Sequence, residues 1–184
     1  KMKEKKLELF TRSITSIFIA LYFLAFIYSN NNYITTAFLM IFATVMGFEW
    51  NYITYTKKDS YLWKLTGILY IFISLFPMLL IKNYDNNFLM WLFIIIWSTD
   101  TFAYIFGKVL GLGKHKICIS ISPGKSYEGL IAGIVFSIIF SYIFTLYFLP
   151  NYKNLLLCFV PIICILEQTS DFFESYIKRK FNIK

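Results

Sequence analysis

The sequence predicts an all-α, polytopic integral membrane protein with about six transmembrane helices and both termini in the cytoplasm. The first observation is composition: 58% of the 184 residues are hydrophobic and 15% are charged, whereas soluble domains carry about 25% charged residues. The second is that long apolar runs recur along the whole chain, whereas a secretory signal peptide gives one such run near the N-terminus. The third is an uneven distribution of lysine and arginine between the connections. We expect residues 1–184 to form a single membrane domain.

The apolar runs define the predicted spans. A transmembrane helix needs about 20 mostly apolar residues, because the hydrocarbon core of a bilayer is about 30 Å thick. Six segments meet or approach this length: residues 13–28, 33–52, 61–81, 87–107, 129–149 and 155–173. The first segment is short, so residues upstream of it must also be part of the membrane span. Polar or turn-forming residues separate the segments, and the longest break covers residues 108–128.

The basic residues indicate which side of the membrane each connection faces. Sixteen of the eighteen lysine and arginine residues fall in the N-terminal segment, the second and fourth connections or the C-terminal segment. Only Lys82 and Lys153 fall on the opposite side. Short basic loops stay in the cytoplasm, so both termini and the long fourth connection are expected there. Topology and anionic membrane lipid then account for the net charge of +8, and no nucleic-acid partner is expected.

Acidic residues within the spans are candidates for function, because each costs roughly 2.5–3.5 kcal/mol to insert. Five lie inside or at the edge of a span: Glu49, Asp100, Glu128, Glu167 and Asp171. For Glu49, an ion pair with Arg12 or a loop lysine explains the presence of an acid within the span as well as a functional role does. Asp100 and Asp171 lie in dense polar sequence, each at the predicted cytoplasmic end of its span.

Two such carboxylates beside lysines form a plausible site for Mg²⁺ and phosphate, since Mg²⁺ binds through one or two carboxylates plus substrate phosphates. Ion or proton transport is the competing use of intramembrane acids. The three cysteines have no CxxC spacing and there is a single histidine, which excludes a four-thiolate or His-cluster metal site.

The segment before the fifth span has residues that favour phosphate binding. Ser122, Lys125 and Ser126 lie just before a helix start, where unpaired backbone amides and the helix dipole attract phosphate. The alternative on local sequence is an ordinary helix start with Ser126 as its N-cap. The glycine-rich run 107–114 misses the register of a P-loop and is rejected as one.

Several motifs follow one another along the chain. Near the end, Ser-Tyr-Ile-Lys-Arg at residues 175–179 is followed by four residues and then Lys184. Upstream lie Asp100-x-x-Ala-Tyr-x-x-Gly, Ser122-Pro-x-Lys, Glu128-Gly and Gln168-x-x-Asp. In this combination the chain resembles the phosphatidate cytidylyltransferase (CDP-diacylglycerol synthase) family, integral membrane enzymes that join CTP to phosphatidic acid. The family usually has lysine where Gly124 stands. Its signature continues beyond the equivalent of residue 184, so the C-terminal portion of the family's domain is expected to be absent here.

The resemblance implies a nucleotidyltransferase that moves CMP from CTP to phosphatidic acid, giving CDP-diacylglycerol and pyrophosphate in phospholipid synthesis. It implies Mg²⁺ as the cofactor and a multi-pass protein of the bacterial inner cell membrane. A homodimer is left open. The alternatives are an inactive truncated membrane fragment of such an enzyme and a small ion-coupled transporter.

The resemblance also implies roles for particular residues. Asp100 and Asp171 are the expected catalytic carboxylates and metal ligands. The basic and hydroxyl residues comprise two catalytic cations and four phosphate contacts: Lys178 and Arg179, then Ser122, Lys125, Ser126 and Lys184.

Overall fold

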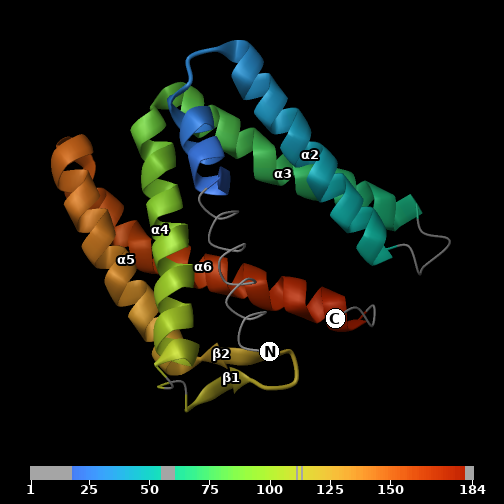
Figure 1. The fold of residues 1–184 in the computed structure, drawn as a ribbon, viewed down its shortest axis with the longest axis vertical. Helices are drawn as coiled ribbons and strands as arrows, with labels where there is room; N and C mark the ends of the chain where they lie inside the picture. The colour runs from blue at the N-terminus through green and yellow to red at the C-terminus, as the bar shows by residue number, and fades with distance from the viewer. Residues whose placement is uncertain (1–17, 55–60, 111, 113, 181–184) are drawn as a thin grey trace, which may run out of the picture.

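The computed structural model describes residues 18–54, 61–110, 112 and 114–180, and most of these residues are helical (Figure 1). Five helices are long and apolar enough to cross a membrane, and a shorter apolar helix, Phe18–Tyr28, precedes them. The long helices are α2 (Asn32–Thr54), α3 (Tyr61–Tyr84), α4 (Asn86–Tyr104), α5 (Tyr127–Phe148) and α6 (Lys153–Lys180). The protein is therefore a helical, multi-pass membrane protein, as the composition predicts.

The observed helices differ from the predicted spans mainly at their ends. The predicted first span, residues 13–28, is described only from Phe18 onward, and its earlier part lies outside the described residues. Helix α6 continues past residue 173 to Lys180. The prediction ended with the last apolar residues of the run, whereas backbone hydrogen bonds continue through the polar sequence that follows.

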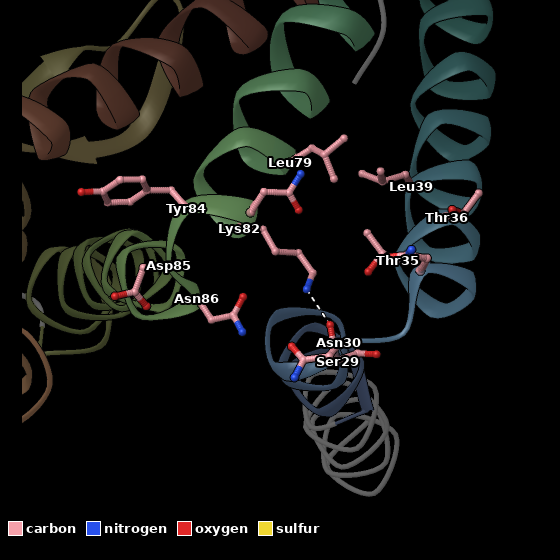
Figure 2. A pocket seen from close by; sticks show the side chains of 12 residues that line it. Ser29, Asn30, Thr35, Thr36, Leu39, Leu79, Lys82, Tyr84, Asp85 and Asn86 are labelled. Atoms are coloured by element: carbon pink, nitrogen blue, oxygen red, sulfur yellow. Dashed lines mark hydrogen bonds between the residues drawn. The ribbon is translucent and has the colours of Figure 1, made fainter.

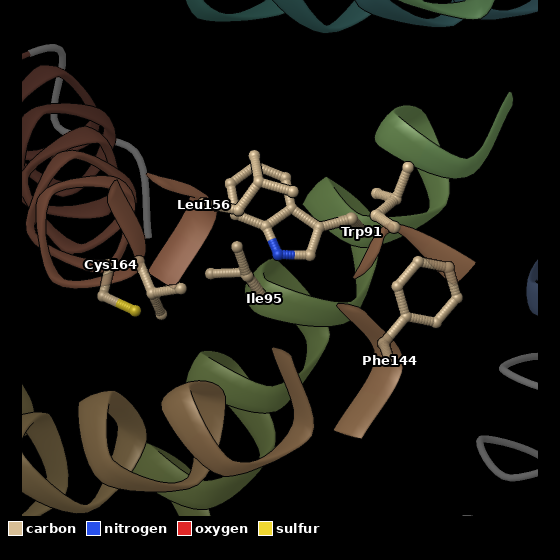
Figure 3. Packing of buried hydrophobic residues seen from close by; sticks show 7 residues of the cluster. Trp91, Ile95, Phe144, Leu156 and Cys164 are labelled. Atoms are coloured by element: carbon tan, nitrogen blue, oxygen red, sulfur yellow. The ribbon is translucent and has the colours of Figure 1, made fainter. Parts of the chain in front are cut away.

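Helix α4 is central to the arrangement. It contacts α3, α5 and α6 (Figure 1). On the side of α5 and α6 the core contains Trp91, Ile95, Phe144 and Leu156, which interdigitate in Figure 3. On the other side, Phe26 of the first described helix stacks on Phe38 of α2 with ring centroids 3.9 Å apart. Dispersion contacts of this kind hold membrane helices together, because lipid tails are as apolar as the side chains themselves.

Small residues along one face of α5 allow α4 to approach closely. They recur every four residues and are all buried: Gly129, Gly133, Ser137, Ser141 and Thr145. A Cβ atom at Gly133 would lie 3.0 Å from the carbonyl oxygen of Thr99 in α4. One at Gly129 would lie 2.7 Å from the carbonyl oxygen of Ala103. Only glycine permits this backbone contact, which brings the end of α4 beside the start of α5.

Large apolar side chains on α2 and α3 face outward, as expected where lipid is the solvent. Only 6% of the most apolar window of each of these helices is buried within the protein. Exposed examples are Met40, Phe48, Ile68 and Phe72. A soluble protein does not leave apolar surface of this extent uncovered, so the exposure agrees with a membrane setting.

The connection between α4 and α5 is predicted as a loop, but it contains regular structure. A π-helical turn, Ile105–Val109, extends α4. An antiparallel hairpin follows, with β1 (Lys116–Cys118) paired to β2 (Ser122–Ser126). The protein is therefore helical, as predicted, with one small β-hairpin in addition. The strand β2 is difficult to predict from sequence because it contains Pro123 and Gly124, and proline enters only edge strands or bulges.

The hairpin lies at one end of the helical bundle. The turns that join α3 to α4 and α5 to α6 lie at the other end (Figure 1). This alternation matches the predicted division of the connections between two sides of a membrane. Which side is cytoplasmic stays a prediction from the lysine and arginine distribution.

Candidate active site at the hairpin end

Three carboxylates meet where α4 and α6 come together near the hairpin. Asp100 projects from α4, while Glu167 and Asp171 project from α6, four residues and hence about one helical turn apart. One carboxylate oxygen from each residue lies within 4.8 Å of the other two. Like charges at this separation repel one another unless a proton or a cation intervenes. Oxygen ligands on three side chains suit a hard divalent cation such as Mg²⁺.

Lys125 brings positive charge to this cluster from β2. Its ammonium lies 2.8 Å from a carboxylate oxygen of Asp171 and donates a hydrogen bond to the carbonyl oxygen of Gln168 at 3.3 Å. The ammonium also lies 4.8 Å from the centroid of the Phe172 ring. The Lys125 side chain is 18% exposed and the Asp171 side chain is 44% exposed, so the ion pair is partly shielded from water.

The turn from β2 into α5 fixes the position of Lys125. Ser126 is the N-cap of α5, and its Oγ accepts a hydrogen bond from the Gly129 amide at 3.2 Å. The N-cap reading of Ser126 is thus confirmed. At the base of the hairpin, the His115 ring nitrogen Nδ1 lies 2.6 Å from a carboxylate oxygen of Glu128, and the Tyr127 amide donates to the His115 carbonyl at 3.0 Å. These contacts tie both strands to the first turn of α5.

A pocket of about 250 Å³ opens between these elements. Its lining includes carboxylates, lysines and a helix start: Asp100, Ala103, Tyr104, Lys108, Gly124, Lys125, Ser126, Gly129, Leu130, Gln168 and Asp171. A cavity needs about 10–15 Å³ of such volume to hold one water molecule, so this pocket accommodates a phosphate group with a hydrated cation.

The predicted site residues divide into those at the pocket and those away from it. Asp100, Asp171, Lys125 and Ser126 all line it. The other predicted residues that the structure describes do not line it: Ser122, Lys178 and Arg179. Ser122 is on β2, and Lys178 pairs with Glu174 at 2.5 Å on the last turns of α6. Lys184 lies outside the described residues.

Two residues join the site that were not among those predicted for it. Lys108 of the π-helical turn lines the pocket, and Glu167 completes the carboxylate cluster. The signal for Glu167 is its spacing from Asp171, because residues four apart share a helix face.

Comparison with known proteins gives one consistent result. Residues 62–184 match the model of the Cytidylyltransferase family. A phosphatidate cytidylyltransferase of Rickettsia felis is 35% identical over 145 residues, which cover 74% of this chain and 62% of that protein. One from Rickettsia bellii is 38% identical over 157 residues, covering 79% and 65%, respectively. One from Staphylococcus aureus is 38% identical over 100 residues, covering 53% and 37%.

The chain spans less than two thirds of the length of these relatives. No solved structure matches it.

Proposed function

This chain belongs to the cytidylyltransferase family, and we propose that it transfers CMP from CTP to phosphatidic acid, giving CDP-diacylglycerol and pyrophosphate. The single observation that carries the proposal is the meeting of Asp100, Glu167, Asp171 and Lys125 beside one pocket. Family membership favours nucleotidyl transfer over ion transport as the use of these intramembrane charges.

The proposed reaction is a displacement at phosphorus. A phosphate oxygen of phosphatidic acid attacks the α-phosphorus of CTP, and the bond from that phosphorus to the oxygen bridging it to the β-phosphorus breaks. The bridging oxygen and its electron pair leave with pyrophosphate. Because the attacking oxygen is already anionic, the reaction needs no strong general base. Catalysis then depends on positioning the two substrates and neutralising charge.

We propose that Asp100, Glu167 and Asp171 hold Mg²⁺. Their oxygen donors and close spacing fit a hard divalent cation, and they repel one another without a positive partner. When bound, Mg²⁺ neutralises charge on the phosphate oxygens of the nucleotide. Asp171 also accepts from Lys125, so the chain itself supplies part of the neutralising charge.

The basic residues take the remaining phosphate charge in this proposal. Lys125 and Lys108 line the pocket and suit contacts to phosphate oxygens near the reacting phosphorus. The Ser126 hydroxyl caps α5, which leaves its proton available to a phosphate oxygen. Three further residues complete the proposed site from outside the pocket lining: Ser122, Lys178 and Arg179. They would contact the outer parts of the substrates. Lys184, which lies outside the described residues, is proposed as a further phosphate contact.

The membrane setting fits a lipid substrate. The diacyl tails of phosphatidic acid would stay in lipid while the headgroup reaches the hairpin end. We propose that this end faces the cytoplasm, where CTP is found, in the cell membrane of a bacterium. The relatives named above are bacterial. A homodimer would bury part of the outward apolar surface of α2 and α3, and crosslinking in native membranes tests for it.

The proposal is tested by following the phosphorus atoms of CTP. Purified protein in mixed micelles is given phosphatidic acid, Mg²⁺ and CTP labelled at the α-phosphorus or, separately, at the γ-phosphorus. We expect the first label in chloroform-soluble CDP-diacylglycerol and the second in pyrophosphate. A folded protein that leaves both labels in CTP would contradict the proposal and favour the inactive fragment. A cation flux into vesicles without transfer would favour the transporter.

A further inference from the structure

A second pocket lies at the end of the bundle away from the carboxylates. It has a volume of about 580 Å³ and is lined by the turn after the first described helix, the start of α2 and the junction of α3 with α4 (Figure 2). Nothing in the proposed reaction uses it. Helix ends here lie where a bilayer exposes its phosphate groups, since each span is about as long as the hydrocarbon core is thick.

Lys82 places a buried cation at this pocket. The residue is 8% exposed and lies near the end of α3. Its ammonium donates hydrogen bonds to the carbonyl oxygens of Ser29 at 2.7 Å and of Ile27 at 3.4 Å. The ammonium also lies 5.4 Å from the centroid of the Phe26 ring, and these two hydrogen bonds use two of its three N–H donors. Among residues 18–54, 61–110, 112 and 114–180, no carboxylate pairs with Lys82.

The surroundings of Lys82 are polar and can donate hydrogen bonds. The pocket is lined by serine, threonine and asparagine side chains from three segments: Ser29, Asn30, Asn32, Thr35, Thr36, Asn83 and Asn86. The helices α2 and α4 also begin here, at Asn32 and Asn86, and helix starts carry partial positive charge.

The acid in the pocket lining does not neutralise Lys82. Asp85 is the N-cap of α4, and its side chain accepts from the Asn87 amide at 2.8 Å. Figure 2 shows its carboxylate on the far side of Asn86 from the Lys82 ammonium. A buried cation without an acidic partner, ringed by neutral donors, favours an anion with several acceptor oxygens.

We infer that this pocket binds the phosphate group of a membrane phospholipid, with Lys82 as its cationic contact. Phosphate supplies the negative charge and acceptor oxygens for which Lys82 has no carboxylate partner among the described residues. The adjoining apolar surface, which includes Leu39 and Leu79, meets the acyl chains. The site is separate from the one proposed for CTP, so binding here is measured independently of CMP transfer.

The experiment measures binding of short-chain lipids to the purified full chain in detergent by native mass spectrometry. The probes are dioctanoyl phosphatidylglycerol, dioctanoylglycerol and inorganic phosphate. We expect phosphatidylglycerol to bind more tightly than the other two. Losing one charge-assisted hydrogen bond in Lys82→Met should weaken phosphatidylglycerol binding at least about tenfold. Lys82→Arg should retain it. Equal binding of dioctanoylglycerol overturns the phosphate site, and equal binding of inorganic phosphate overturns the lipid as its source.

A second variant decides the question if Lys82→Met does not fold. Asn86→Asp adds a negative charge at the pocket, and an acid in the first turn of α4 stabilises that helix. It should repel the lipid phosphate and weaken binding to a similar degree. Asn154→Asp is the matched control, because Asn154 is an exposed residue in the first turn of α6 at the same end of the bundle. Unchanged binding in Asn86→Asp, or equal losses in both variants, would overturn the inference.

Discussion

The ammonium of Lys125 lies 2.8 Å from a carboxylate oxygen of Asp171, and this contact joins the hairpin to α6. The same carboxylate belongs to the cluster with Asp100 and Glu167. Lys125 therefore contacts the acidic cluster and lines the same pocket as Asp100 and Asp171. This arrangement suits a lysine that neutralises charge on both a metal-binding carboxylate and a bound phosphate.

The role of Lys125 predicts the effect of removing its charge. Lys125→Met should reduce kcat/KM for CTP by roughly 10-fold to 150-fold, the equivalent of about 1.5–3 kcal/mol for hydrogen bonds to a charged group. Lys125→Arg should recover part of the loss. Lys114→Met is the control, because Lys114 is exposed in the same connection and does not line the pocket. Equal effects of Lys125→Met and Lys114→Met on steady-state kinetics would argue against a phosphate contact.

Glu167 is expected to control metal affinity more than the chemical step. Glu167→Gln keeps the size of the side chain and removes one anionic ligand, so half-maximal activity should need at least about tenfold more Mg²⁺. The rate at saturating Mg²⁺ should fall less. Glu49→Gln is the control, since Glu49 is an exposed carboxylate of α2 outside the cluster. A Mg²⁺ titration that superimposes on that of the unmodified protein would remove Glu167 from the metal site.

Prediction from sequence succeeded where the physical signal was local. The spans follow from apolar runs, and the N-cap at Ser126 follows from a hydroxyl before a helix. The grouping of Asp100 with Asp171 was expected because each lies in polar sequence at the predicted cytoplasmic end of its span. Their proximity to Glu167 depends on how α4 crosses α6. The close approach of α4 to α5 depends on glycines that meet backbone atoms of another helix, as Gly129 meets Ala103, and a single sequence does not show such pairs.

Gly129 should be sensitive to the smallest possible substitution. A Cβ atom in Gly129→Ala would lie 2.7 Å from the carbonyl oxygen of Ala103, so α4 and α5 must separate. We expect the free energy of unfolding to fall by about 1–3 kcal/mol, as is usual for overpacking. Gly47→Ala is the control, because its Cβ atom would meet only the Ile71 side chain at 3.9 Å. Thermal unfolding in detergent compares the two, and equal midpoints would show that the close approach is not required.

Cys118 in the hairpin tests both the topology and the local geometry. Its thiol lies 3.3 Å from the Ser120 hydroxyl, and that hydrogen bond, which stabilises the thiolate, lowers the pKa of Cys118 below its ordinary value. A lowered pKa keeps more thiolate present as the pH falls, so labelling by a maleimide should persist to lower pH than for an ordinary thiol. Ser120→Ala should move the labelling profile to higher pH. An unchanged profile would argue against the hydrogen bond.

The sidedness of the same labelling tests the topology. A membrane-impermeant maleimide should modify Cys118 in inverted vesicles and leave it unmodified in intact cells, with the labelled peptide identified by mass spectrometry. Labelling of Cys118 from outside the cell would reverse the topology and remove the hairpin end from the cytoplasmic pool of CTP.

The most direct test of the proposed active site is the Mg²⁺-dependent transfer of CMP by Asp171→Asn. This variant keeps the shape of the side chain and removes the charge shared by the acidic cluster and Lys125. Formation of CDP-diacylglycerol should fall at least about 10²-fold, since losing one electrostatic stabiliser commonly costs about 2.7–4 kcal/mol. Membrane insertion should survive, because an amide is no harder to bury than a carboxylate. Lys153→Ala, at the far end of the bundle, should leave turnover unchanged. Near-normal activity of Asp171→Asn across the whole Mg²⁺ titration would contradict the account.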